Sequence, residues 1–144
     1  MKESYKNTGK LIFCTSDALS NIRLEAGNFS CWLHFHVPGW VGFAKAIRHL
    51  AENKCALFHA SGTDSPESHD RIDDVLDELG KSEILTSWDE GNISEAAAGY
   101  WDMTIVEKEF QTKIICAIGA NLDEELLLLR EMAAGLQKAS QAID

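Results

Sequence analysis

The sequence lacks a long hydrophobic run. None of its 144 residues belongs to an apolar stretch that approaches the roughly 20 residues of a membrane-spanning helix. The opening residues, Met1 to Lys6, are mostly polar and are not followed by an apolar segment, so we expect no secretory signal. The length fits one domain covering 1–144. These features together predict a globular, cytoplasmic protein.

Closely spaced cysteines are also absent. Zinc modules and thioredoxin-like redox sites need Cys-x-x-Cys spacing, which occurs nowhere in this chain. Each cysteine lies in or beside an apolar run, which predicts free, buried thiols and no disulfide. The four cysteines are Cys14, Cys31, Cys55 and Cys116.

Basic residues are scarce in the second part of the chain. Residues 61–144 contain six Lys and Arg against 19 Asp and Glu, and the formal net charge of the whole chain is −10. Twelve of the acidic residues lie within 61–102. Such a field disfavours nucleic acids and anionic membranes, which bind through Lys and Arg. It favours a basic protein partner.

Strand-like and helix-like segments alternate along the chain. This pattern predicts an α/β fold, a small three-layer Rossmann-like or flavodoxin-like sandwich with a mostly parallel sheet of about five strands. Segments 55–60 and 113–119 are apolar nearly throughout, as central parallel strands are. The other predicted strands are 10–15, 31–37 and 83–88, with 21–25 as a further short edge strand.

The helices are predicted from apolar spacing and from end signals. They cover 40–52, the segment from Ser65 to Gly80, 93–102, and a C-terminal helix that starts after Asn121. Asn92-x-x-Glu95 and Asn121-x-x-Glu124 resemble capping boxes. In the last helix, we expect an inward-facing set made of Leu126, Leu129, Met132, Ala133 and Leu136.

Polar side chains follow the predicted strands at their carboxyl ends. Ligands of open α/β sheets bind beyond these ends, so this rim is the predicted ligand or partner site. We expect Trp88 and Asp89 at the mouth of a cleft, with Asp89 capping the turn after its strand. A Trp88 that lies on the helix near 93–102 is the alternative. The predicted rim residues are His36, His59, Ser61, Thr86, Trp88 and Asp89.

Metal and cofactor chemistry have only partial support. Alternation along a strand puts Trp32, His34 and His36 on one face, where two imidazoles could bind a metal. No spacing fixes a third ligand, and histidines packed under a helix or facing solvent are the competing reading. The loop from Ser61 to Ser65 precedes a helix but carries no phosphate-binding glycine pattern. We therefore assign no metal and no cofactor.

Nucleophilic catalysis has candidates without a complete motif. Ser61, Ser87 or Cys55 could pair with His59 or His36. No G-x-S-x-G elbow or family-type cysteine signature is present. No catalytic residue is assigned, and the sequence favours a non-enzymatic role.

An acidic stripe marks the helix after the segment 55–60. Its carboxylates lie at i, i+3, i+4 and i+7, all on one side of the helix. The stripe is either a solvated face or a docking face for a basic partner. The residues are Asp70, Asp73, Asp74 and Asp77.

The segment Ile84-Leu85-Thr86-Ser87-Trp88-Asp89-Glu90 resembles the signature of an uncharacterised bacterial family of small α/β domains. That family carries Val-Met-Thr-Thr-Trp-His followed by acidic residues and a helix. This chain has Ser87 in place of Thr and Asp89 in place of His. The resemblance spans roughly residues 50–135 and implies a small α/β domain, with no established activity.

Two functional hypotheses remain. The first is an acidic protein-interaction module, immunity- or antitoxin-like, that masks a basic partner. It is favoured by the localised acidity and by the lack of a complete catalytic motif. The second is a small-ligand-binding or hydrolytic domain that uses the rim at the strand ends.

Overall fold

The computed structural model describes residues 10–24, 28–106 and 112–142. Strands and helices alternate along these residues. The strands are β1 (Lys10–Thr15), β2 (Phe29–Phe35), β3 (Cys55–Gly62), β4 (Leu85–Asp89) and β5 (Thr112–Ile118). The helices are α2 (Ser16–Leu19), α3 (Phe43–Glu52), α4 (Ser65–Glu78), α5 (Ile93–Val106) and α6 (Leu122–Ala142).

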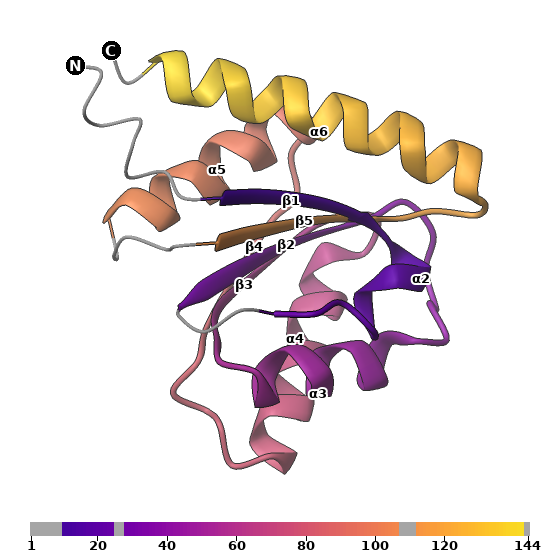
Figure 1. Ribbon diagram of the computed structural model, residues 1–144, viewed down its shortest axis with the longest axis vertical. Helices are drawn as coiled ribbons and strands as arrows, with labels where there is room; N and C mark the ends of the chain where they lie inside the picture. The colour runs from indigo at the N-terminus through magenta and orange to yellow at the C-terminus, as the bar shows by residue number, and fades with distance from the viewer. Residues whose placement is uncertain (1–9, 25–27, 107–111, 143–144) are drawn as a thin grey trace.

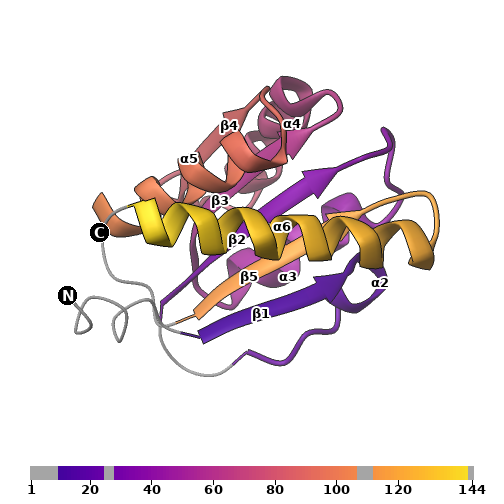
Figure 2. The ribbon, with the colours of Figure 1, turned by 90° about the horizontal axis from the view of Figure 1, so that it is seen from above.

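The strands form one sheet in the order β1-β5-β2-β3-β4, and every neighbouring pair is parallel. Flavodoxin-like sheets have the strand order 2-1-3-4-5. The present sheet has the same order if β5 is counted as the first strand and β1 to β4 as the second to fifth, so it is a circular permutation of that order. The predicted α/β fold is confirmed. The two most apolar segments are interior strands, β3 and β5, on either side of the central β2 (Figure 2).

Helices cover both faces of the sheet (Figure 1). Helices α2, α3 and α4 lie on one face, and α5 and α6 lie on the other. The alternation along β2 follows this division. Cys31, Leu33 and Phe35 pack with α3 and α4, whereas Trp32 packs with α5 and α6. The predicted period of two along this strand is therefore confirmed.

All four cysteines are free and buried, as predicted. They belong to the core on the α3 and α4 side of the sheet. Cys14 of β1 lies opposite Cys116 of β5 in the strand register. Burial is the main cause that raises the pKa of the Cys31 and Cys55 thiols, so both stay protonated at neutral pH.

Several boundaries and one inward-facing residue differ from the sequence-based expectations. Residues 21–24 form no strand, and Glu25 lies outside the described residues. The prediction that Leu126 faces inward is wrong, because its side chain is 48% exposed. Glu125 takes the inward position and is 5% exposed. Its carboxylate is buried because backbone and hydroxyl donors surround it, as described below.

The two predicted helix starts are confirmed in detail. At α5, the Asn92 side chain accepts a hydrogen bond from the Glu95 N–H, and the Glu95 carboxylate accepts one from the Asn92 N–H. At α6, the Asn121 side chain accepts the Glu124 N–H. The bonds are reciprocal at α5, whereas at α6 the Glu124 carboxylate accepts the Ala120 N–H. Both sets satisfy donors that a helix start leaves unpaired.

Candidate functional site

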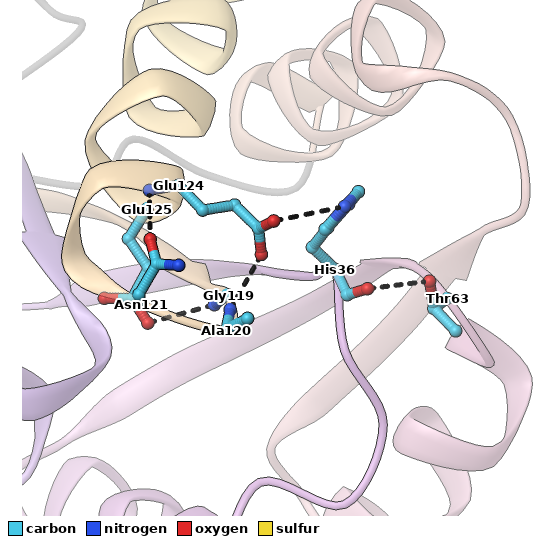
Figure 3. Close-up of polar contacts among 7 residues, drawn as sticks. All are labelled: His36, Thr63, Gly119, Ala120, Asn121, Glu124 and Glu125. Atoms are coloured by element: carbon cyan, nitrogen blue, oxygen red, sulfur yellow. Dashed lines mark hydrogen bonds and ion pairs between the residues drawn. The ribbon is translucent and has the colours of Figure 1, made fainter.

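Strands β2 and β5 are neighbours, but the chain after β2 leads to α3 on one face of the sheet and the chain after β5 leads to α6 on the other face. His36 follows β2 there, with a side chain that is 52% exposed. Its Nε2 lies 3.7 Å from the Glu124 carboxylate of α6 (Figure 3). The Thr63 hydroxyl donates to the His36 carbonyl at 3.3 Å. Flavodoxin-like domains place ligands at this kind of crevice.

In this chain, two carboxylates of α6 bind the backbone donors at these strand ends. Glu125 accepts hydrogen bonds from the Ser16 N–H at 2.9 Å, the Ser16 hydroxyl at 2.6 Å and the Gly119 N–H at 2.9 Å. Glu124 accepts the Ala120 N–H at 2.7 Å (Figure 3). These backbone donors would otherwise suit a phosphate. The arrangement therefore disfavours binding of an anionic cofactor at the β5–α6 turn.

Two of the predicted rim residues, His59 and Ser61, lie beneath α5 and α6. The Trp32 indole N–H donates to the Ser61 hydroxyl at 2.7 Å, and Ser61 pairs with His34 Nδ1 at 2.8 Å. His59 Nδ1 lies 2.6 Å from the Ser87 hydroxyl. Ser61 is 0% exposed and His59 is 3% exposed. They belong to a buried polar network rather than to an open rim.

The network continues under α5 through an aromatic ring. The rings of His59 and Tyr100 stack with centroids 5.9 Å apart, and the Tyr100 hydroxyl hydrogen-bonds to Ser30 at 2.5 Å. The sequence reasoning placed Trp32 and His34 on one face but did not single out Ser30 or Tyr100. A signal was present, since a serine within an otherwise apolar buried strand needs a hydrogen-bond partner.

Burial keeps both histidines of this network neutral at physiological pH. The pKa of His34 falls to about 4, first because of burial and second because of His36. The pKa of His59 also falls to about 4 because of burial, with partial opposition from Asp89 and the Ala96 backbone. Neither imidazole carries a charge near pH 7.

These low pKa values predict an acid-sensitive fold. Both values lie below the usual 6.5. The unfolded chain therefore binds more protons than the folded chain between pH 6.5 and about 4. We expect the free energy of unfolding to decrease as the pH is lowered through this window, by up to about 1.4 kcal/mol per pH unit for each histidine. Urea unfolding measured between about pH 6.5 and 5, above the main titration of carboxylates, checks this. A His59→Gln variant should show about half the slope, and a flat profile in the parent protein would contradict the expectation.

The other rim residues of β4 lie on two different faces. Thr86 and Trp88 face α4, where the Thr86 hydroxyl donates to Asp73 at 2.8 Å and accepts from His69 at 3.0 Å. Trp88 is 42% exposed, with its ring 6.5 Å from that of His69. Asp89 caps its turn by accepting the Gly91 N–H at 2.6 Å, as predicted.

The structure thus distributes the six predicted residues over four places. His36 lies at the β2–β5 crevice, His59 and Ser61 lie in the buried network, and Thr86 and Trp88 lie beside α4. Asp89 turns toward α5, where its carboxylate and the His59 ring both lie near Gly99. No single cleft gathers the predicted rim, because successive residues of a strand point to opposite faces.

Serine–histidine pairs exist, but neither is a complete catalytic arrangement among the described residues. Ser61 is fully buried, so its hydroxyl has no access to a substrate. Ser87 pairs with His59, one of the combinations that the sequence allowed, and Asp89 lies nearby. The Nε2 atom of His59 has no hydrogen-bond partner in the described part of the chain, so Asp89 does not orient the imidazole as a triad acid would.

The acidic stripe on α4 lies next to β4. Asp70 contacts His69 Nδ1 at 3.3 Å, Asp73 binds Thr86, and Asp77 accepts the Ser82 hydroxyl at 2.6 Å. Asp74 is exposed. His69, Asp70 and Asp73 offer ligand atoms within 4.8 Å of one another and could hold a metal ion. Exposed acidic groups commonly lie this close without an ion.

Two concave regions of the described part of the chain bear on ligand binding. A groove of about 620 Å³ lies between α5 and α6, with walls that are mostly apolar. Its lining includes His34, Asn92, Ile93, Ser94, Glu131, Ala134, Gly135 and Lys138. A smaller cavity of about 290 Å³ at the start of α4 is lined in part by Asp64, Glu67 and Glu90. Three carboxylates there oppose a phosphate.

The chain matches no family model, and neither the curated proteins nor the solved structures include a significant match. In the described part of the chain, no helix is long and apolar enough to cross a membrane.

Proposed function

We propose that this protein is an interaction module that binds a basic protein partner through the surface formed by β4 and α4. One observation carries the proposal. Strand β4 is an edge strand with two exposed apolar side chains, and the acidic stripe of α4 runs beside it. We call this the β4–α4 surface. It consists of Leu85, Trp88, Asp70, Asp73, Asp74 and Asp77.

Each part of the surface contributes a different kind of contact. The outer edge of β4 pairs with no described strand, so its backbone groups can bind an extended segment of another protein. Leu85 and Trp88 are 43% and 42% exposed and offer apolar area on either side of that edge. The carboxylates attract lysine and arginine. The preferred partner therefore presents a basic segment in extended conformation.

Because the surface is acidic, we propose that the protein masks its basic partner, as an immunity- or antitoxin-like protein does. We propose the cytoplasm as its compartment, because four buried free thiols suit a reducing environment. The small-ligand alternative lacks the common rim that it requires, because the predicted residues lie on different faces of the sheet.

Charge reversal tests the proposal. Asp70 and Asp74 are the suitable pair, because both are exposed, whereas Asp73 is hydrogen-bonded to β4. The double variant Asp70→Lys/Asp74→Lys should keep its stability within about 1 kcal/mol. Its association with a partner isolated from the native host should slow at least about tenfold at low salt, because long-range attraction becomes repulsion. Association rates at low and high salt measure this.

The matched control is Glu52→Lys/Asp102→Lys. It changes the net charge by the same amount at two exposed positions on α3 and α5. Slower association in the first variant alone supports the β4–α4 surface. Equal slowing in both variants would show that net charge alone sets the association rate, which contradicts a specific β4–α4 surface. Unchanged rates in both variants would also reject the proposal.

A further inference from the structure

His34 contributes its imidazole to the lining of the groove between α5 and α6. The side chain is 6% exposed, and His34 lines the groove. Its Nδ1 is held by Ser61. No hydrogen bond to Nε2 is present within the described ranges. A side-chain nitrogen that lines a groove and has no protein partner can hydrogen-bond to a ligand there.

The hydrogen bonds around Ser61 favour one tautomer of His34. The Trp32 indole can only donate, so the Ser61 oxygen accepts from it at 2.7 Å. The Ser61 hydrogen is then free to be donated to His34 Nδ1, the other partner, at 2.8 Å. With the hydroxyl donating to Nδ1, the neutral imidazole carries its proton on Nε2, and the proposal uses this tautomer. Ser61 acts as a positioning residue, and His34 offers an N–H donor to the groove.

Other donors gather at the same place. The first turn of α5 lines the groove through Ile93 and Ser94. The capping box uses the Asn92 and Glu95 N–H groups, which leaves those of Ile93 and Ser94 for a ligand. Lys138 adds a positive charge from α6, and Glu131 is the one acidic side chain of the lining. The positive end of the α5 dipole adds to these donors.

We propose that this groove binds a small organic molecule that carries a carboxylate and an apolar body. The carboxylate lies at the α5 N-terminus, where His34 Nε2 and the two backbone N–H groups donate to it and Lys138 balances its charge. The apolar body lies along the wall formed by Ile93, Ala134 and Gly135. A volume of about 620 Å³ accommodates a molecule of this size. The proposal does not depend on the β4–α4 surface, because none of its residues belongs to β4 or α4.

Titration with phenylacetate, followed by amide NMR, tests the proposal. Phenylacetate should shift the amide signals of Ile93 and Ser94 and the ring signals of His34 in a saturable manner. Phenylacetamide has the same shape without the charge and should bind at least about tenfold more weakly. Because His34 acts as a neutral donor, affinity should not rise when the pH is lowered from 8 toward about 6.

Three variants locate the site. Ala134→Trp fills the groove from an exposed helix position and should abolish the shifts. Lys138→Gln should weaken binding about tenfold, whereas Lys45→Gln, an exposed lysine on α3, should not change it. Ser61→Ala should alter the nitrogen signals of His34, because the imidazole loses the group that fixes its tautomer. Absence of shifts at millimolar phenylacetate, equal binding of the amide, or equal effects of the two lysine variants would overturn the proposal.

Discussion

Replacing Gly62 with alanine should destabilise the protein by about 4 kcal/mol or more. Gly62 ends β3 with a φ of +94°, a conformation that residues with a Cβ rarely adopt. A Cβ at this position would overlap the carbonyl oxygen of Phe35 and lie 2.9 Å from its carbonyl carbon. These are backbone atoms, so they cannot move aside as a flexible side chain would. The Thr63 N–H donates to the same carbonyl at 2.6 Å and holds the two strand ends together.

Gly80 provides the matched control for this substitution. It also has a positive φ, of +71°, but a Cβ there meets no atom within 4 Å. Gly80→Ala should therefore cost only the strain of the left-handed conformation, about 1–2 kcal/mol. Urea unfolding of both variants, followed by circular dichroism, measures the difference. Equal costs would mean that the β2–β3 junction relaxes around a methyl group.

The Gly62 junction also affects the buried network, because Gly62 follows Ser61 directly. In a Gly62→Ala protein that still folds, the Ser61 hydrogen bonds to Trp32 and His34 should weaken. The ring signals of His34 would then change together with the stability. A substitution at Gly62 should therefore affect His34, which lines the groove between α5 and α6.

The sequence predicted the fold because its strongest signals arise from burial. Segments 55–60 and 113–119 are apolar on both faces, which only interior parallel strands require. Both are interior strands in the structure. The helix starts at Asn92 and Asn121 were also predicted, because their hydrogen bonds are local in sequence.

The candidate site could not be predicted in the same way. The sequence shows that Thr86 and Ser87 point to opposite faces, but it does not show which helix covers each face. In the structure, Thr86 contacts α4, and Ser87 contacts His59 on the opposite face of the sheet. Of the two histidines on β2 and its end, His34 is buried and lines the groove, whereas His36 is exposed at the strand end. That choice depends on where α6 crosses the sheet, which is a long-range property.

Glu125 is the second place where tertiary structure overrides the local pattern. The apolar period predicts Leu126 inside the core, yet Leu126 is exposed and Glu125 is buried. A buried carboxylate is tolerated when several donors satisfy it. Here the donors come from Ser16 at the start of α2 and from Gly119 after β5. Glu125 thereby ties the start of α2 to the β5–α6 turn, 109 residues away along the chain.

Replacing Glu125 with alanine should consequently lower the free energy of unfolding by about 3 kcal/mol. The change removes three hydrogen bonds to a charged group and leaves the N–H groups of Ser16 and Gly119 without their acceptor. For a domain of 144 residues, this corresponds to a fall of about 10 °C in Tm. Glu125→Gln keeps the side-chain size but turns an amide N–H₂ toward one of the donors, so it should lie between alanine and the parent protein.

Asp123→Ala is the control for Glu125→Ala, because Asp123 is an exposed acid in the same first turn of α6. It loses only a favourable interaction with the helix dipole, at most about 1 kcal/mol. Calorimetry and urea unfolding of the three variants should rank Glu125→Ala below Glu125→Gln and Glu125→Gln below Asp123→Ala. A Glu125→Ala protein as stable as Asp123→Ala would show that water replaces the carboxylate at no cost. The β5–α6 turn would then have donors available for an anion, contrary to the arrangement described here.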